Sequence, residues 1–227
     1  MRRYDIPLND YYTMGLRKTI IKYNPLVKVR QHTERKRLQK NVTILASNCM
    51  GGLLYHDLGQ QFLSPTVNTR FDSPDFVRFV CNIHDYLMME LKFIPSDETF
   101  PVAMLGDVRV NFVHYHTNEE AEKKWKERIA RIDWDNVYVI TNDNDGMTEA
   151  DFAALDACEF KNVLAFTSKP MPQHRCAFQL KQFGHLSEVG NTMLRSIFTG
   201  EMEVQKSFDF VGWFNQEKGV DLENYRK

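Results

Sequence analysis

The sequence has few cysteines, no long apolar run and almost no net charge, and each shortage excludes a class of protein. Its four cysteines lie far apart without CxxC spacing, which excludes a disulfide scaffold and a cysteine-only zinc cluster. No stretch reaches the roughly 18 uncharged apolar residues of a transmembrane helix. With 29 basic and 30 acidic residues, the chain lacks the basic excess of nucleic-acid-binding proteins, so we expect no nucleic-acid partner.

The first residues, Met1 to Pro7, lack the apolar segment of a secretory signal, which leads us to expect a cytoplasmic protein. The length of 227 residues suits one large domain. We expect a single α/β domain at 41–227, preceded by a basic helical extension at 1–40 that Pro25 interrupts. The basic run from Arg30 to Lys40 indicates a solvated helix face or, as the alternative, a contact with anionic phospholipid and hence peripheral membrane association.

Apolar, β-rich runs alternate with helix signals along the rest of the chain. Buried strands or hairpin strands are expected at Val42–Ala46, Pro101–Tyr115 (turning at Gly106-Asp107), Val137–Thr141 and Asn162–Thr167. Helices are expected at Leu53–Gly59, Ser73–Leu91, Thr117–Ile132, Thr148–Ala157, Phe178–Gln182, Val189–Phe198 and Phe208–Lys218. This order predicts an α/β fold, a Rossmann-like three-layer sandwich with a mostly parallel, mixed sheet.

The loop that follows the first strand, Ser47 to Gly52, is the leading candidate site, because open α/β sheets bind ligands at the carboxyl ends of their strands. Gly51 and Gly52 allow close backbone approach, and the start of the next helix favours an anion, with Asn48 as a side-chain donor. The same helix start favours the thiolate of Cys49, which makes it a candidate nucleophile. The alternative is a tight turn in which Cys49 only fills space.

Two acidic residues after a later strand are candidate metal ligands. Asp143 and Asp145 have the spacing of the DxD motif of many nucleotide-sugar glycosyltransferases, in which carboxylates hold Mg²⁺ or Mn²⁺. An ordinary Asx-rich turn is the alternative. Ser64 and Asn68, from the loop after the first helix, are candidate polar contacts to a ligand.

A third set of candidates comes from the hairpin and the helix after it. His114 ends a strand and is a candidate general base, with Tyr115 beside it as a ligand contact. Asp107, at the hairpin turn, is a candidate catalytic acid whose alternative is to bind backbone N–H groups. Arg128 and Arg131 lie three apart on one helix face, where they can clamp phosphate or carboxylate or else pair with neighbouring glutamates.

These motifs, taken in order, resemble one bacterial family, named domain of unknown function nineteen-nineteen and often labelled exopolysaccharide biosynthesis protein. The resemblance rests on Asn48-Cys49-Met50-Gly51-Gly52, Leu63–Asn68, Leu105-Gly106-Asp107, Phe112–Tyr115, Trp125, Arg128–Ile132, Asp143–Gly146 and Phe208–Asn215. It covers most of the chain, and it departs from the family pattern at Met50, where the family often has Trp.

The resemblance implies a role in surface-polysaccharide biosynthesis. We therefore expect a transferase that acts on a sugar, an activated sugar or a carrier-linked glycan, with a sugar- or phosphate-containing ligand and with Mg²⁺ or Mn²⁺ as the cofactor if a metal is bound. Two alternatives stay open. One is a non-catalytic assembly partner that reaches the membrane through the basic extension, and the other is a hydrolase in which Cys49 and His114 act as nucleophile and base.

Overall fold

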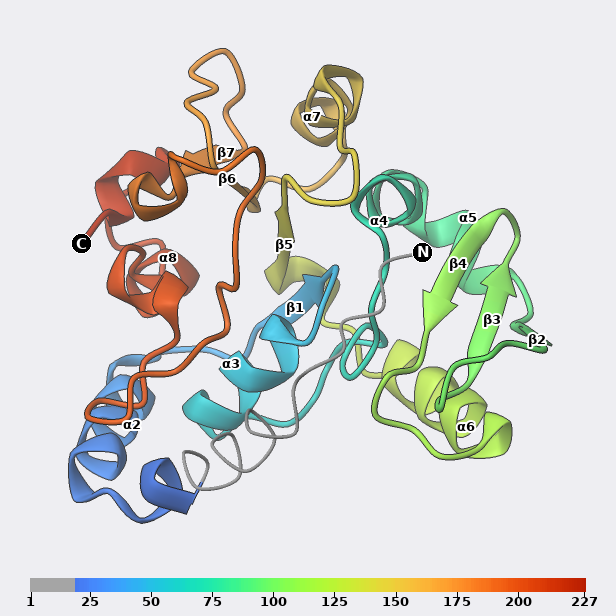
Figure 1. Ribbon diagram of the computed structural model, residues 1–227, viewed down its shortest axis with the longest axis horizontal. Coiled ribbons are helices and arrows are strands. Elements are labelled where there is room, and N and C mark those ends of the chain that lie inside the picture. The colour runs from blue at the N-terminus through green and yellow to red at the C-terminus, as the bar shows by residue number, and fades with distance from the viewer. Residues whose placement is uncertain (1–18) are drawn as a thin grey trace.

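A parallel sheet forms the centre of the protein, and a smaller antiparallel sheet lies beside it (Figure 1). The structure is a computed structural model that describes residues 19–227, so the first part of the expected basic extension, residues 1–18, lies outside the described residues. The parallel sheet has the order β1-β5-β6-β7, with β1 Thr43–Ala46, β5 Val137–Asn142, β6 Val163–Thr167 and β7 Ala177–Gln179. The antiparallel sheet has the order β2-β3-β4, with β2 Lys92–Ile94, β3 Val102–Leu105 and β4 Val108–Asn111.

The parallel sheet carries a core on each face, because successive side chains of a strand point to opposite sides. Ile44 and Ile140 face a core that α3 (Met50–Leu58) and α8 (Phe210–Phe214) complete. Their neighbours in sequence, such as Leu45, contribute to the core on the other face. There the sheet packs against α4 (Ser73–Cys81) and α7 (Glu149–Ala157). The sheet and these two helix layers confirm the expected α/β fold (Figure 1).

The predicted hairpin is present as β3 and β4, but it belongs to the separate antiparallel sheet together with β2, a strand that the sequence pattern did not predict. A short extended segment links the two sheets. Phe71 N donates to Ser47 O (2.8 Å) beside β1, and Arg70 N donates to Asn111 O (2.8 Å) at the end of β4. Because Phe71 occupies this position at the end of β1, the hairpin strands do not extend the parallel sheet.

The basic helix α2 (Pro25–Arg37) packs against α3 and the C-terminal segment. Arg30 pairs with the buried carboxylate of Asp57 (3.1 Å). At the end of the helix, Arg37 pairs with Asp209 (2.6 Å). The expectation of a solvated basic face is therefore wrong for these two arginines, because each pairs with an acidic residue of the folded domain. Both acidic partners lie far away in the sequence, so the sequence pattern did not reveal them.

Two helices expected in the C-terminal part are wrong. Phe178–Gln182 forms β7 and the 3-10 turn η2 (Lys181–Phe183) instead, because β6 pairs with this segment as a parallel strand. Val189–Phe198 is irregular, and the N–H of Val189 donates to the carboxylate of Asp143 (2.6 Å). In the N-terminal half, the helix expected from Ser73 is divided at Asn82.

The remaining elements complete the chain. They are α5 Ile83–Met88, α6 Asn118–Ile129, η1 Trp134–Asn136, η3 Glu203–Lys206 and η4 Leu222–Tyr225. From residue 19 onward, no helix combines the length and the apolar character needed to cross a membrane.

Candidate functional site

A groove of about 560 Å³ lies at the carboxyl edge of the parallel sheet, where β1 and β5 end. Parallel strands that end at one edge bring their following loops together, and open α/β sheets bind ligands there. The loops after β1 and β5 form one wall of the groove, and an irregular loop, residues 186–193, forms the other. We call this feature the strand-end groove. It is lined by Ser47, Asn48, Arg70, Phe71, Ser73, Asn142, Asn144, Asp145 and the loop 186–193.

The loop after β1 forms part of the groove and leads into α3. The Asn48 side chain accepts a hydrogen bond from Met50 N (2.9 Å), which stabilises the first turn of that helix. A Cβ added at Gly51 would lie 3.1 Å from the Cβ of Ala46, and one added at Gly52 would lie 3.4 Å from the side chain of Asn68. The two glycines therefore allow α3 to pack closely on β1 and on the loop at residue 68.

Cys49 follows Asn48 and does not line the groove. Burial raises the pKa of its thiol, and the charge of Arg70 offsets this only in part. Burial at Cys49 therefore opposes the thiolate that the sequence predicted at the helix start, and the role of Cys49 as a nucleophile stays a prediction. A cysteine in this state is mostly a neutral thiol near pH 7.

Asp143, just after β5, binds backbone groups of two neighbouring loops. Its carboxylate accepts hydrogen bonds from Ser168 N (2.6 Å) and from Val189 N (2.6 Å). Burial raises the pKa of Asp143, although these hydrogen bonds favour the charged form. The geometry gives Asp143 a positioning role, since it holds the 186–193 wall against the end of β5.

The two asparagines on either side of Asp143 present amide oxygens without donors. Asn142, the last residue of β5, is 7% exposed, and neither its Oδ1 nor the Oδ1 of Asn144 has a hydrogen-bond partner in the described structure. The Asn144 Nδ2 donates to Val189 O (3.0 Å), which fixes which end of that amide is the oxygen. Buried acceptors of this kind are uncommon, and each costs about 1–3 kcal/mol while it has no donor.

A partly exposed ion pair lies at the rim of the groove. Arg70 lies 3.7 Å from Asp145 and 3.3 Å from Asp72. Burial, together with the charge of Asp72, raises the pKa of Asp145, while Arg70 lowers it. Asp145 also has a φ of 60°, a conformation that costs energy for a residue other than glycine and that is concentrated at functional sites.

Three predicted site residues lie away from the groove. Asp107, at the turn between β3 and β4, accepts a hydrogen bond from the hydroxyl of Tyr86 (2.6 Å). His114 is exposed on the loop after β4. Arg131, two residues after the end of α6, pairs with Glu127 (3.5 Å), in agreement with the alternative interpretation.

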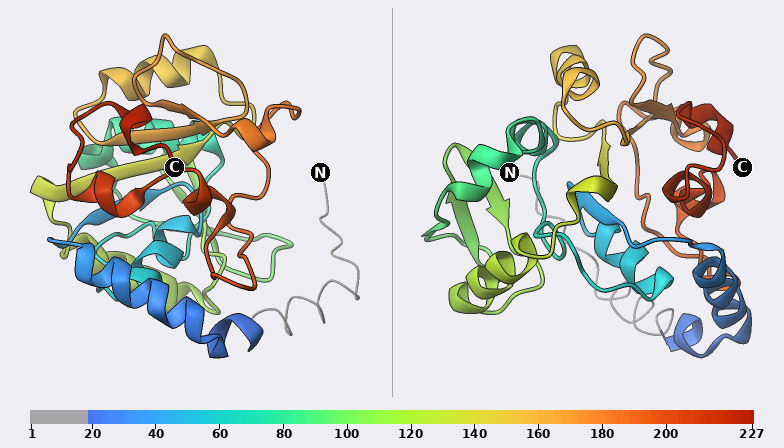
Figure 2. Two further views of the ribbon diagram at one scale, coloured as in Figure 1. Left: turned by 90° about the vertical axis from the view of Figure 1, so that its left-hand side faces the viewer. Right: turned by 180° about the vertical axis from the view of Figure 1, so that it is seen from behind.

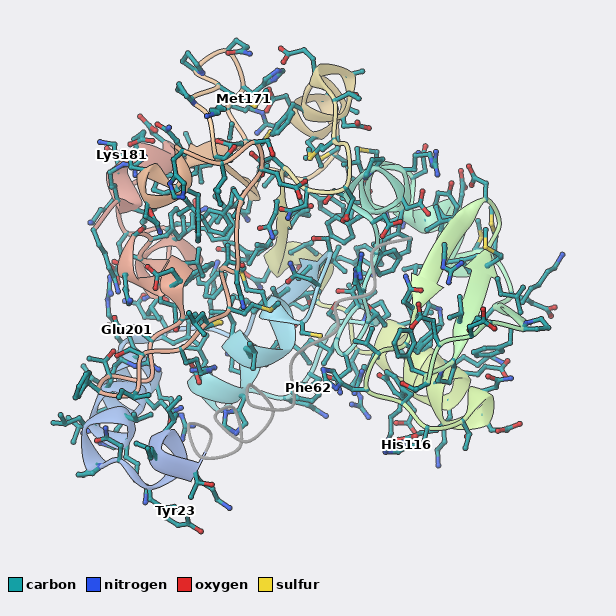
Figure 3. The ribbon with its side chains drawn as sticks, in the orientation of Figure 1. Tyr23, Phe62, His116, Met171, Lys181 and Glu201 are labelled. Atoms are coloured by element: carbon teal, nitrogen blue, oxygen red, sulfur yellow. The ribbon has the colours of Figure 1, made fainter. Side chains whose placement is uncertain are left out.

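The other predicted arginine of α6 points inward. Arg128 is 6% exposed, and its Nη1 donates to Val67 O (2.8 Å) and to the hydroxyl of Tyr115. Its guanidinium lies over the ring of Phe62, a residue labelled in Figure 3. Ser64 is buried as well and bonds to Thr66 Oγ1 (2.9 Å). These residues hold α6 to the loop after α3 and do not line the groove.

The predicted metal ligands have different partners. Asp143 accepts from backbone N–H groups, whereas Asp145 faces Arg70. Within residues 19–227, no three His, Cys, Asp or Glu side chains are grouped so that they could hold a metal ion. Binding of Mg²⁺ or Mn²⁺ at these carboxylates stays a prediction.

Sequence reasoning missed three parts of the groove: Arg70, Asn142 and the 186–193 wall. Asn142 had a signal, because a polar residue that ends a buried apolar strand at its carboxyl end points to this edge of the sheet. Arg70 had none, since it approaches Asp145 only through the bridge between the two sheets. The wall had a misleading signal, because its apolar spacing resembles that of a helix.

Comparisons with known proteins agree with the resemblance seen in the sequence. The sequence model of the family described as "Domain of unknown function (DUF1919)" matches residues 21–215. A protein of Haemophilus influenzae described as "Uncharacterized protein" is 37% identical over 182 residues, which cover 80% of this chain and 88% of the relative. The predicted family is confirmed.

Proposed function

The chain belongs to the family described as Domain of unknown function (DUF1919), and we propose that it is a cytoplasmic transferase of surface-polysaccharide biosynthesis that holds a sugar-containing substrate in the strand-end groove. One observation carries the proposal: the groove is lined mainly by neutral hydroxyl and amide side chains, among them Asn142 and Asn144, whose buried amide oxygens have no donor among the described residues. The role in polysaccharide biosynthesis comes from the family resemblance and the substrate class from the chemistry of the groove.

The two amide oxygens are buried in the chain without ligand, so a ligand reaches them only when these side chains turn toward the groove, and it must then donate hydrogen bonds. A sugar hydroxyl donates one bond and accepts others, so it can pair with Asn142 Oδ1 and with its neighbours at once. An ionised phosphate carries mainly acceptor oxygens and leaves the amide oxygens unpaired. Satisfying two buried acceptors recovers the free energy that their isolation costs, which favours bound over free sugar.

The charges around the groove also favour a neutral polyol over a phosphate. Among the described residues of the lining, Arg70 is the only basic one, and Asp145 and Glu188 are acidic. The remaining polar lining consists of neutral hydroxyl and amide side chains, and Leu186 and Met193 add apolar surface for the C–H face of a sugar ring. Of the expected substrates, a glycan or an unphosphorylated sugar residue fits this lining best.

Asp145 is the residue that we assign to the chemical step. Its raised pKa and its place at the rim suit a general base, which takes the proton from an acceptor hydroxyl as that oxygen attacks the transferred group. The leaving group departs with the electron pair of the broken bond. Arg70, 3.7 Å away, orients the carboxylate.

Binding is tested by titrating the protein with a panel of monosaccharides, oligosaccharides and inorganic phosphate, followed by calorimetry or ligand-observed NMR. We expect at least one sugar to bind, phosphate not to compete, and Asn142→Ala to weaken sugar binding by roughly 10-fold or more, since one hydrogen bond to a buried group is lost. The matched control is Asn162→Ala at the opposite end of the sheet, which should leave binding unchanged. Competition by phosphate in place of sugars would contradict the proposal.

The role of Asp145 is tested separately by Asp145→Asn. If Asp145 is the base, this variant binds the sugar with nearly the wild-type affinity and loses turnover by about 10²–10⁴-fold. Cys49→Ala serves as the comparison, and it should keep most of the activity because Cys49 does not line the groove. Loss of activity in Cys49→Ala with normal turnover in Asp145→Asn would overturn this assignment.

A further inference from the structure

One corner of the molecule exposes an unusual set of large apolar side chains. Tyr23, Leu26, Val29 and Phe198 are each more than 60% exposed, and Ile20 and Leu194 are more than 40% exposed. We call these six residues the α2 corner. Clusters of exposed apolar residues on a folded domain mark interaction sites more often than isolated ones do.

The backbone under the α2 corner is held in place. Asn24 Nδ2 donates to Ile197 O (3.0 Å) and to Phe198 O (2.9 Å), which fixes the tip of the hairpin 194–202 beside the start of α2. Further along, a Cβ at Gly200 would lie 2.7 Å from the side chain of Val27, so hairpin and helix are in close contact. The exposed side chains therefore project from a backbone that hydrogen bonds and close packing hold in place.

Basic side chains surround the apolar ones. Lys22 is exposed in the short helical segment before Asn24, and Lys28 and Lys36 are exposed on α2, where neither forms an ion pair within the described part of the chain. The only acid of residues 19–37 is Glu34, which is half-buried. The protein as a whole has a net charge of −1, so this local excess of positive charge is a property of the corner.

We propose that the α2 corner docks on a lipid bilayer that contains anionic phospholipid. Exposed apolar and aromatic side chains beside lysines suit a bilayer interface, where the apolar groups enter the headgroup region and each lysine adds favourable attraction to anionic lipid. Lysine is depleted from protein–protein interfaces, which disfavours a protein partner on this surface. The corner also protrudes, as the position of Tyr23 at the far edge of the molecule shows (Figure 3).

The docked corner and the groove lie on one side of the protein. The loop 186–193 that lines the groove continues directly into the hairpin 194–202. Figure 2 shows the start of α2 and this hairpin on the side toward which the strands of the parallel sheet point. If the groove binds sugar, as proposed above, the substrate that this arrangement suits is a glycan attached to a lipid in the membrane; this last step alone rests on the proposed function.

Docking is tested by flotation of the full-length protein with vesicles of phosphatidylethanolamine, with and without phosphatidylglycerol. We expect the protein to float with the anionic vesicles, and the bound fraction to fall at high salt. The double variant Leu26→Ser/Phe198→Ser should weaken binding by roughly tenfold for each side chain. Its matched control is Met88→Ser/Val220→Ser, which removes two apolar side chains that are at least as exposed elsewhere.

The contribution of charge is measured with Lys22→Glu/Lys28→Glu against Lys123→Glu/Lys161→Glu, two exposed lysines outside the corner. Only the first pair should reduce flotation. Thermal unfolding of every variant confirms that it is folded.

Three results would overturn the proposal. They are no flotation of the wild-type protein with anionic vesicles, equal loss in the control variants, and a concentration-dependent dimer that Leu26→Ser/Phe198→Ser dissolves in the absence of lipid. Sugar binding is measured without vesicles and vesicle binding without sugar, so failure of one proposal is distinguishable from failure of the other. If both hold, a lipid-linked sugar in vesicles should bind the wild type more tightly than the free sugar does, and the α2-corner double variant should lose this difference.

Discussion

Two buried polar regions of this protein differ in how completely their hydrogen bonds are made. Asp57, on α3, is 1% exposed and accepts from Arg30 (3.1 Å), Gln31 (3.0 Å) and Arg195 (3.0 Å). Asn142, at the end of β5, is 7% exposed, and its amide oxygen accepts no hydrogen bond from the described residues. Asp57 and Asn142 are therefore similarly buried, but they differ in the number of hydrogen-bond donors that their side-chain oxygens have.

The difference separates a structural role from a binding role. A buried charge with a complete set of partners ties distant segments together, and at Asp57 these are α2, α3 and the hairpin 194–202. A buried amide oxygen without a donor lowers stability, and under the proposed function the bound sugar supplies the missing donor.

The largest expected effect comes from removing the charge at the fully bonded site. Asp57→Asn leaves Arg30 and Arg195 buried without their carboxylate and should lower the free energy of unfolding by about 3–5 kcal/mol. Urea unfolding measures this loss, with Asp97→Asn on the surface as the control. A loss no larger than that of the control would mean that the network around Asp57 does not hold α2 to the domain.

A smaller effect separates two asparagines at opposite ends of the parallel sheet. Asn162 donates to Val137 O (3.1 Å) and accepts from Gln216 (3.2 Å), so Asn162→Ala should cost about 1–3 kcal/mol of stability. Asn142→Ala removes an acceptor without a donor, so it should not lower stability and should raise it by up to about 3 kcal/mol. Thermal unfolding of both variants measures these two changes in stability. Equal destabilisation would show that the Asn142 amide is as important for the fold as the Asn162 amide.

The smallest effect is a pH dependence at His174, whose side chain is 8% exposed between Asp156 (2.9 Å) and Glu149 (2.7 Å). Burial lowers the pKa of His174, but the hydrogen bonds to the two carboxylates raise it more, so that its pKa is raised overall. A raised pKa in the folded state means that this contribution to stability is complete below about pH 6.5, the usual histidine value, and is lost as the pH rises through the folded-state pKa. His174→Gln should flatten the pH profile of the unfolding midpoint in this range, and an unchanged profile would show that the pKa of His174 is the same in the folded and the unfolded chain.

The sequence predicted the parts of the fold that depend on local pattern. β1, β5 and β6 are runs of buried apolar residues, and the capping box of Thr148 and Asp151 marks the start of α7 as expected. The parts decided by distant partners were missed or wrong. Phe178 forms a strand because β6 lies beside it, and Arg30 is buried because Asp57 lies 27 residues further along the chain.

The sequence predicted where the candidate groove lies, but not most of the residues that line it. Its location after β1 and β5 follows from the rule for parallel strands, and Asn48 and Asp145 do line the groove. The orientation of side chains could not be read from spacing. Arg128 and Arg131 are three residues apart, yet Arg128 is buried on α6 against Tyr115, whereas Arg131 lies after the end of α6 and pairs with Glu127 at the surface.

The most direct test of the strand-end groove is a crystal structure of the protein with a bound sugar. We predict sugar hydroxyl oxygens within roughly 3 Å of both Asn142 Oδ1 and Asn144 Oδ1, with the sugar ring against the loop 186–193. A sugar bound elsewhere, with both amide oxygens still without a donor from the ligand, would contradict it.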